Sequence, residues 1–417
     1  MSEVSDQDSE KEIEDRYAAF RHKSYQRYWI SRFSNSFSAQ IVSVAVAWQI
    51  YDIGRDPFHL GLVGLSQFLP SLLLVLVTGV IADRLGRRLI MALTDLIEAG
   101  CALAILYLTV TGVDEVWPFF PILIVFGIAR AFNGPATSAL IASMVPTKDF
   151  PNAVAWNSSA WQSATIVGPV AGGLLYGVAP EVAYLVAIIL FLIATLFAYL
   201  IPKPTTKRKR DAVNLTTLLA GFSYIYREKV VLGVISLDLF AVLMGGAVAL
   251  MPVYARDILQ LGPWGLGLLR AAPGIGAIGI ALWLTGKPIK DHAGIIMLIC
   301  VGLFGFFTVV FGASTIVWVS ILALALLGAA DMVSVYIRET IIQLWTPDEL
   351  RGRVNAVNMV FVGASNELGE FRAGTMAAFM GAVPAVVLGG VGAIGCAAMW
   401  GYLFPKMRDT KHLQGKH

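Results

Sequence analysis

Long apolar stretches alternate with short polar breaks along almost the whole chain. Twelve stretches are long enough for a helix that crosses a bilayer, which takes about 20 residues. Most breaks carry turn-forming and charged residues, such as Gly54-Arg55-Asp56-Pro57. The pattern predicts an all-α membrane protein with twelve transmembrane helices near 30–52, 58–82, 89–112, 117–145, 152–178, 181–201, 230–255, 264–285, 293–312, 315–344, 354–380 and 382–404.

The composition supports a membrane protein. Of 417 residues, 57% are hydrophobic and 14% are charged, whereas soluble domains contain about 25% charged residues. The net charge of +3 gives no indication of nucleic-acid binding. The polar N-terminal segment begins acidic, unlike a secretory signal, so the first helix is expected to stay in the protein.

Basic residues predict the orientation and the division of the chain. With a cytoplasmic N-terminus, 25 of the 31 Lys and Arg residues fall on the cytoplasmic side, and only Arg55 and Arg256 fall in outer loops. Both termini are therefore expected in the cytoplasm. The basic segment Lys207–Arg210 is interpreted as a solvated linker or as a contact with lipid headgroups. The predicted parts are a cytoplasmic tail (1–29), a six-helix bundle (30–201), a cytoplasmic linker (202–229), a second six-helix bundle (230–404) and a cytoplasmic tail (405–417).

The two predicted bundles repeat each other. Pro146 is followed by Asn152-Ala153-Val154, and Pro347 is followed by Asn355-Ala356-Val357. Such a parallel repeat is typical of secondary transporters built from two bundles. Aligning the halves pairs Arg130 with Asp331, and Asn35 with Asp238.

The segment between the second and third helices is a motif: Gly79-Val80-Ile81-Ala82-Asp83-Arg84-Leu85-Gly86-Arg87-Arg88. It resembles the G-x-x-x-D-R-x-G-R-R loop of the major facilitator superfamily. The resemblance implies a cytoplasmic latch that stabilises the outward-open state. Asp83 would cap a facing helix, Gly79 would allow close helix approach, and Arg84, Arg87 and Arg88 would close the contact. A basic loop without a gating role is the alternative.

Helices four and five carry two further motifs. Arg130 with Gly134 resembles the superfamily's intramembrane arginine motif. Gly168-Pro169 with Gly172-Gly173 resembles the motif found mainly in its antiporters, although Ala164 replaces the glycine usual before that pair. Small residues allow close helix contact, so tight packing without directional meaning is the alternative.

The second half carries a narrower resemblance. Segments 331–340, 346–354 and 365–374, together with 130–136, are similar to the enterobactin-exporter-like branch, in the third drug:proton antiporter group. The resemblance implies a monomeric exporter of the bacterial inner membrane. It would move a small amphiphilic molecule, siderophore or drug-like, in exchange for protons. The proton gradient would supply the energy, and no cofactor is implied.

Ionisable residues inside the membrane are functional candidates because lipid exposure is costly. Asp238 and Asp331 are the first candidates for proton coupling. The alternative is a structural pair of Asp331 with Arg130 or Arg338. Glu367 and Glu370 share a helix face; they would bind protons or a cationic group, or pair with arginines.

Other polar residues are weaker candidates. Asn35, Gln40 and Trp161 would suit an aromatic substrate, although tryptophans are often interface anchors. Asp95 and Glu98 are expected to have a structural role near the latch. Arg130 would bias a proton site or form a buried ion pair.

Rival functions are a lysophospholipid flippase or nutrient importer of the same fold, and more remotely a membrane-embedded enzyme or receptor. The sequence contains no HExxH, GxSxG or P-loop motif and no clustered histidines, so no catalytic residue or metal site is predicted. The three cysteines form no CxxC pair.

Overall fold

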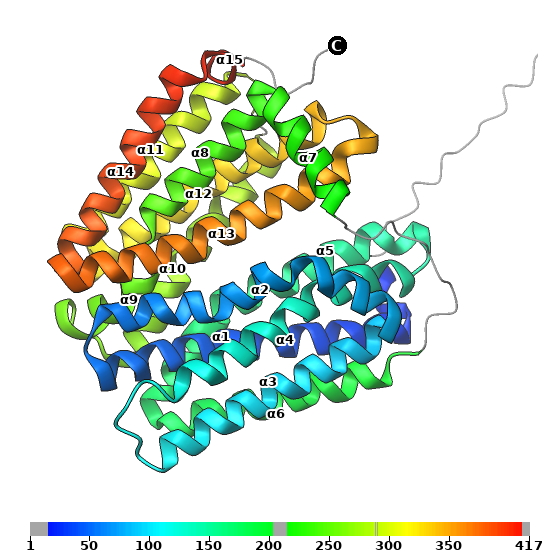
Figure 1. The fold of residues 1–417 in the computed structure, drawn as a ribbon, viewed down its shortest axis with the longest axis vertical. Coiled ribbons are helices and arrows are strands. Elements are labelled where there is room, and N and C mark those ends of the chain that lie inside the picture. Colours follow the sequence, from blue (N-terminus) through cyan, green and yellow to red (C-terminus); the bar gives the residue numbers. More distant parts are fainter. Residues whose placement is uncertain (1–15, 203–214, 288, 290, 411–417) are drawn as a thin grey trace, which may run out of the picture.

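A computed structural model describes residues 16–202, 215–287, 289 and 291–410. Twelve long helices fill these ranges, consistent with the twelve predicted spans (Figure 1). The seventh span starts as α8 and continues through η4 (Val248–Leu250), α9 (Met251–Val253) and the π-helical segment η5 (Tyr254–Ile258). The long helices are α1 (Lys23–Gly54), α2 (Pro57–Leu85), α3 (Arg87–Val110), α4 (Phe119–Leu140), α5 (Phe150–Val178), α6 (Pro180–Leu200), α8 (Lys229–Gly245), α10 (Gly262–Gly286), α11 (Ala293–Ala313), α12 (Val317–Trp345), α13 (Asp348–Met380) and α14 (Ala382–Leu403).

Within the described ranges, nine spans are long and apolar enough to cross a membrane by composition. The other long helices, α1, α5 and α13, carry more polar residues. Polar side chains inside a membrane face a bundle interior or a water-filled cavity. These three helices are therefore expected beside the interior of the protein, and the cavity described below includes residues from all three.

The helices form two bundles, α1–α6 and α8–α14, which lie one above the other in Figure 1. A further helix, α7 (Leu215–Arg227), was not predicted. It packs against the start of α13, where Gly221 lies against the backbone of Arg353, and Tyr224 donates a hydrogen bond to the carbonyl of Trp345. The basic segment 207–210 lies outside the described residues, so the prediction of a solvated linker there is untested.

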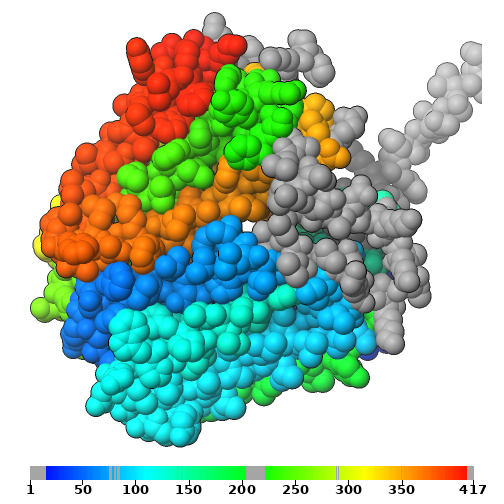
Figure 2. Space-filling view, viewed as in Figure 1, coloured from blue at the N-terminus to red at the C-terminus, as the bar shows by residue number. Residues whose placement is uncertain are grey.

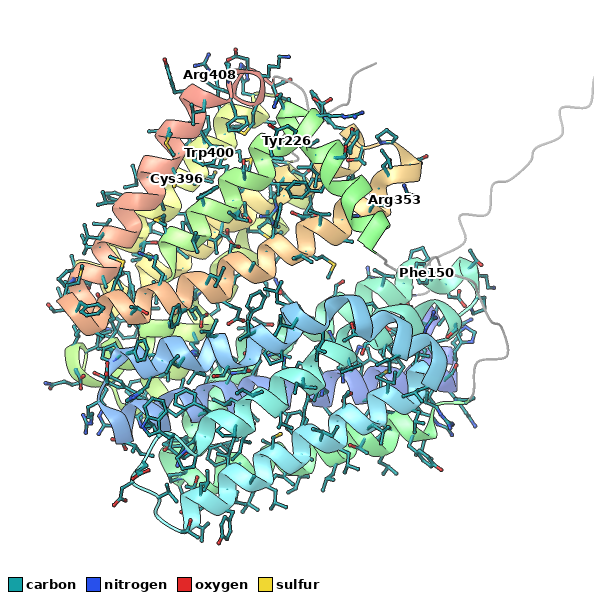
Figure 3. The ribbon with its side chains drawn as sticks, in the orientation of Figure 1. Phe150, Tyr226, Arg353, Cys396, Trp400 and Arg408 are labelled. Atoms are coloured by element: carbon teal, nitrogen blue, oxygen red, sulfur yellow. The ribbon has the colours of Figure 1, made fainter. Side chains whose placement is uncertain are left out.

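The molecule has two ends, which we call the basic end and the clamp end. The basic end contains the α2–α3 and α4–α5 connections, α7, the α12–α13 connection and the C-terminal helix α15 (Pro405–Arg408). Phe150, Arg353 and Arg408 mark it in Figure 3. The clamp end contains the α1–α2 connection and η5, and carries the charged contacts described below.

In the part of the chain that the structure describes, the hydrophobic core joins the two bundles at the clamp end. One cluster of buried apolar residues there includes Tyr51 from the first bundle and Leu250 and Phe311 from the second. At the basic end, the described residues form a separate cluster in each bundle, around Tyr28 in the first and Ile337 in the second. Among the described residues, shared apolar packing thus joins the bundles at one end and not at the other.

Small residues let helices of the two bundles pack closely against each other, in two contacts here called seams. Gly173 of α5 lies against the backbone of Pro263 and Gly267 of α10, and any larger side chain there would meet main-chain atoms. Gly61 of α2 and Gly374 of α13 make the matching contact on the second seam. Figure 2 shows α2 and α13 in contact along the face of the molecule.

Candidate transport cavity

A cavity of about 520 Å³ lies between the two bundles. Its size is within the range of small-molecule sites. Two neighbouring compartments, of about 300 Å³ and about 100 Å³, share part of its wall, and Glu370 lines all three spaces. The polar residues of the main compartment include Arg32, Asn35, Gln40, Glu98, Arg130 and Trp161 from the first bundle and Arg270 and Glu370 from the second.

Three carboxyl groups of the second bundle reach these spaces. Asp331 lines the compartment of about 300 Å³, Glu367 lines the compartment of about 100 Å³, and Glu370 lies where they meet. In residues 16–202, 215–287, 289 and 291–410, none of the three takes part in an ion pair or hydrogen bond identified in the structure. They are acids that face the cavities and form no ion pair with a described residue.

Three arginines also line the main compartment. Arg32 comes from α1, Arg130 from α4 and Arg270 from α10. Nη1 of Arg270 donates to Ser43 Oγ at 2.7 Å, and Nη1 of Arg130 donates to Gln67 Oε1 at 3.4 Å. None of the three forms an ion pair with another described residue. The alternative in which Arg130 pairs with Asp331 is therefore not what the structure contains.

The first bundle holds a buried network of carboxyls and amides beside the cavity. Asn35 Nδ2 donates to Asp95 Oδ1 at 2.9 Å and also to Glu98 Oε2. Asn133 Nδ2 donates to Asp95 Oδ1 at 2.8 Å. Asp95 and Glu98 are 0% and 1% exposed, and neither forms an ion pair with a described residue. Glu98 also lines the main compartment, which its position in the sequence did not indicate.

The second bundle uses a different arrangement at the repeat-equivalent place. Asp238 of α8 forms an ion pair with Arg338 of α12, and both are buried. Arg338 Nε also lies 3.7 Å from Glu339 Oε1, which accepts a hydrogen bond from Asn358 Nδ2 at 3.0 Å. Asp238 lines none of the three compartments. This corrects its expected place in the cavity wall, because α12 supplies an arginine that holds it within the bundle.

The other candidates from the sequence fall in two groups. Asn35, Gln40 and Trp161 line the main compartment, as a substrate-binding role requires, although their role stays a prediction. In α5, Gly168 lies against Gln40, and Gly172 lies against Ile41 of α1. Gly173 of the same motif forms the seam with α10.

The predicted latch is only partly described. The side chains of Asp83 and Arg84, and the surroundings of Gly79, lie outside the described residues. Gly86 separates α2 from α3 with φ +88°, a conformation that favours glycine. Arg88 Nη1 donates to the carbonyl of Ile201 at 2.8 Å, so it binds the end of α6 in its own bundle instead of closing a contact with the other.

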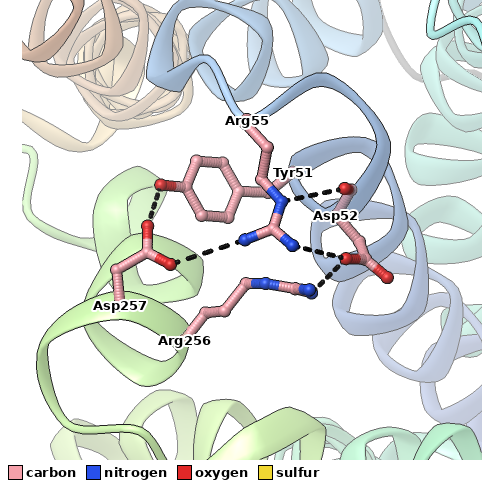
Figure 4. A network of polar contacts seen from close by, with 5 residues as sticks. All are labelled: Tyr51, Asp52, Arg55, Arg256 and Asp257. Atoms are coloured by element: carbon pink, nitrogen blue, oxygen red, sulfur yellow. Dashed lines mark hydrogen bonds and ion pairs between the residues drawn. The ribbon is translucent and has the colours of Figure 1, made fainter.

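Charged residues join the bundles at the clamp end (Figure 4). Arg256 pairs with Asp52, Arg55 Nη1 lies 3.7 Å from Asp257 Oδ1, and the Tyr51 hydroxyl donates to Asp257. Arg55 also lies 3.5 Å from Asp52 within its own bundle. These five residues, here called the outer clamp, tie the end of α1 to η5.

Sequence analysis missed the role of the outer clamp and of Arg32 and Arg270. Arg55 and Arg256 were counted only as the two outer-loop arginines. Their presence where basic residues are scarce was the available signal. Arg55 also has φ +49° at the end of α1, a position usually taken by glycine. Arg32 lies in the first part of α1, and only the structure shows that it reaches the main compartment.

Similar solved structures show the fold. A bacterial homologue of the human lysosomal transporter Spinster, in an inward-facing and occupied conformation, superposes with a TM-score of 0.73 at 14% identity, covering 95% of this chain and 99% of that one. The POT family transporter PepTSo gives a TM-score of 0.70 at 12% identity, covering 92% of this chain and 98% of that one. The chain therefore has the major facilitator fold of a multi-pass membrane protein, as predicted.

The family follows from sequence comparison. Residues 14–415 match the transmembrane secretion effectors of the major facilitator superfamily, and the chain belongs to this family. The enterobactin exporter EntS of Escherichia coli O81 (strain ED1a) is 25% identical over 398 residues, which cover 89% of this chain and 86% of that protein. The multidrug resistance protein MdtG of Serratia proteamaculans (strain 568) is 24% identical over 330 residues, covering 77% and 78%.

Proposed function

We propose that this protein exports a small amphiphilic organic molecule in exchange for protons. The observation that carries the proposal is a cavity between two bundles that contains three carboxyl groups without an ion-pair partner among the described residues: Asp331, Glu367 and Glu370. A buried acid that has no fixed counter-charge and can reach water is suited to binding and releasing a proton. Asp238 is not suited to this role, because Arg338 neutralises it.

The names of similar proteins support the direction and the kind of cargo. EntS is named as an enterobactin exporter and MdtG as a multidrug resistance protein. The first name describes export, and the second describes resistance to several drugs, which outward transport of small organic molecules would explain. By this similarity, the cargo is siderophore or drug-like, and the protein acts in a bacterial inner membrane.

The two ends of the molecule support transport by alternating access. If the basic end is cytoplasmic, as the distribution of Lys and Arg predicts, the bundles are joined on the outer side and separate on the inner side. The cavity is then loaded from the cytoplasm. Release outside requires the outer clamp to open while the bundles approach at the basic end, by the rocking motion described for such repeats.

One chain contains the complete proposed site. Both bundles contribute to the wall of the main compartment, with Arg130 from the first and Arg270 from the second. The protein is therefore proposed to act as a monomer. It would need no cofactor, because the proton gradient supplies the energy.

A reconstituted system tests exchange against cotransport. Proteoliposomes containing the purified protein are prepared with an acidic or an alkaline lumen, and accumulation of enterobactin is measured against protein-free vesicles. Proton exchange predicts accumulation into the acidic lumen, because protons leave as the substrate enters. Accumulation driven only by an alkaline lumen would support the importer alternative, and equal translocation without a gradient would support a flippase.

Carboxyl variants test the coupling assignment. Asp331→Asn and Glu370→Gln should abolish the part of the substrate flux that depends on the pH gradient. Exchange of substrate between equal concentrations inside and outside the vesicles should remain. Asp348→Asn is the matched control, because its side chain is 80% exposed at the basic end. Unchanged gradient-driven flux in both cavity variants would reject the assignment.

A further inference from the structure

We propose that the molecule bound in this cavity is an amphiphilic anion. Its charged group would contact Arg32, Arg130 and Arg270, and its apolar body would lie in the neighbouring compartment of about 300 Å³. The proposal rests on the proposed function only in taking the protein to be a transporter with a central binding site. It adds the sign of the substrate's charge and the orientation of the bound molecule.

The three arginines carry this proposal because their hydrogen-bonding capacity is largely unused. A guanidinium has five N–H donors. Within the described chain, Arg32 takes part in no hydrogen bond or ion pair, and Arg130 and Arg270 each donate one hydrogen bond, to a neutral side chain. The Nε atoms of Arg32 and Arg270 are buried without a partner. Buried donors without acceptors are costly, and a bound anion would supply acceptors.

The carboxyl groups in the same wall do not cancel this charge. The main compartment is lined by three arginines and by two acids, Glu98 and Glu370. Glu98 already accepts a hydrogen bond from Asn35 within the first bundle. Even with both acids ionised, the wall of this compartment carries one net positive charge, and protonation of either acid would increase it. The neighbouring compartments add Asp331 and Glu367, so this surplus of positive charge belongs to the main compartment, where the charged group is placed.

The neighbouring compartment has a different chemistry. Its wall includes the apolar residues Val242, Phe304, Leu324 and Leu327. Polar side chains are few there, and Asp331 lies among them. This space shares Val248, Met251, Pro273, Gly274 and Glu370 with the arginine-lined compartment. One elongated molecule can therefore place a charged group in one compartment and an apolar body in the other.

An aromatic ring beside the charged group fits the same wall. The Arg32 guanidinium lies 5.4 Å from the centre of the Trp161 ring, which is within the range of a cation–π contact. Trp161 is 42% exposed and lines the main compartment. Its free indole surface can stack on a planar group that sits next to the anion. Export of an anion would also be favoured by a membrane potential that is negative inside.

Two fluorescent probes that share one ring system test the proposal. 1-Anilinonaphthalene-8-sulfonate is an amphiphilic anion, and N-phenyl-1-naphthylamine lacks its sulfonate. Binding of each is measured to the full-length protein in nanodiscs of zwitterionic lipid, with empty nanodiscs as background. The wild type should bind the sulfonate probe more tightly. Arg32→Gln, Arg130→Gln and Arg270→Gln should each weaken that binding about tenfold, as expected for one charge-assisted hydrogen bond. Binding of the uncharged probe should change by less than about twofold.

Matched variants separate recognition from folding. Arg372→Gln removes an intramembrane arginine that lines none of the three compartments and binds the carbonyl of Leu243 instead. Thermal unfolding shows which variants are folded. Arg130→Lys keeps the charge and should recover part of the affinity for the sulfonate probe that is lost in Arg130→Gln. This comparison remains informative even if another variant fails to fold.

Several results would overturn the proposal. The first is a wild type that binds the two probes equally tightly. The second is a loss of affinity in the three arginine variants that is as large for the uncharged probe as for the sulfonate probe. The third is an affinity for the sulfonate probe that is unchanged in all three variants. These are equilibrium measurements that need no gradient. A protein that binds the anion but shows no gradient-driven flux would contradict the proposed function alone, and a protein that exports only uncharged or cationic molecules would contradict this inference alone.

Discussion

At repeat-equivalent places, the two bundles bury carboxyl groups in different ways. In the second bundle, Arg338 neutralises Asp238 in a buried ion pair. In the first bundle, Asp95 and Glu98 share the amide of Asn35 and have no ion-pair partner among the described residues. Asn35 and Asp238 are equivalent in the sequence repeat. The same position therefore provides a neutral donor in one half and a charged acceptor in the other.

This difference separates structural charge from charge that is free to change. An ion pair inside a protein is destabilised strongly when one partner is removed, because the remaining charge has no compensation. Carboxyls held by amides can gain or lose a proton without leaving an unpaired arginine behind. We expect variants of the Asp238–Arg338 pair to affect folding first and variants of the network around Asn35 to affect it less.

The largest effect should come from breaking the ion pair of the second bundle. Arg338→Gln leaves Asp238 buried without its cation, and Asp238→Asn leaves Arg338 with only the more distant carboxylate of Glu339. Each should cost about 3–5 kcal/mol of unfolding free energy. Thermal unfolding midpoints and the yield of monodisperse protein in detergent measure the effect.

A double variant tests whether the pair itself is the cause. Asp238→Leu with Arg338→Met replaces both charges by apolar groups, which is often neutral or stabilising for a buried pair. We expect the double variant to unfold at a higher temperature than either single variant. Two single variants as stable as the wild type would show that the pair is solvated and would remove the contrast between the bundles.

The next effect should come from the amide of the first bundle. Asn35→Ala removes the donor that Asp95 and Glu98 share. Leaving buried acceptors unsatisfied should cost about 1–3 kcal/mol. Asn366→Ala is the control, because Asn366 is exposed and its amide only binds the carbonyl of Val362 in its own helix. A loss as large as that of the ion-pair variants would mean that both networks are structural.

The fold could be predicted because its signals are local. Apolar run length is a property of single segments, and it predicted spans consistent with the twelve long helices. The superfamily fold was predicted from the resemblance of the motif at residues 79–88, which is also a single segment. Helix α7 was missed because only 13 residues, Leu215–Arg227, form it after a highly charged stretch. Its partner, the start of α13, is distant in the sequence.

The pairing of charges could not be predicted because it depends on how helices are rotated and placed. Arg338 lies seven residues after Asp331 on one helix, which suggested a pair on a common face. Both side chains leave the same helix, and Arg338 reaches across to Asp238 on α8. Tyr51 and Asp257 of the outer clamp are 206 positions apart in the chain. Contacts of this kind follow from the packing of bundles and not from any segment.

A smaller effect on stability is expected when a carboxyl of the first bundle loses its charge. In Glu98→Gln the side-chain oxygen can still accept the hydrogen bond from Asn35, and one buried acid is removed. The unfolding free energy should change by less than about 1 kcal/mol. The matched experiment is Asp238→Asn, the same change in the second bundle. Equal losses of thermal stability in these two variants would contradict the distinction between the bundles.

The smallest effect on stability should come from the outer clamp, where the same ionic chemistry is partly exposed to solvent. Asp52 and Arg55 have side chains that are 43% and 55% exposed, in contrast to 8% and 5% for Asp238 and Arg338. Exposed ion pairs contribute about 0–1 kcal/mol. Arg256→Gln should therefore leave the unfolding midpoint nearly unchanged.

The clamp should matter instead for the balance between conformations, because it joins the bundles at one end only. A loss of about 0.5–1 kcal/mol from the closed clamp corresponds to a roughly twofold to fivefold shift in population. Spin labels at Val110→Cys and Trp318→Cys, in a protein whose three buried cysteines are replaced, would report the distance between the bundles at this end. Arg256→Gln should increase the population with the longer distance, whereas Arg408→Gln, at the basic end, should not. An unchanged distance distribution in Arg256→Gln would mean that apolar packing around Tyr51 and Leu250 holds this end closed, and that the ion pairs contribute nothing measurable to the closed state.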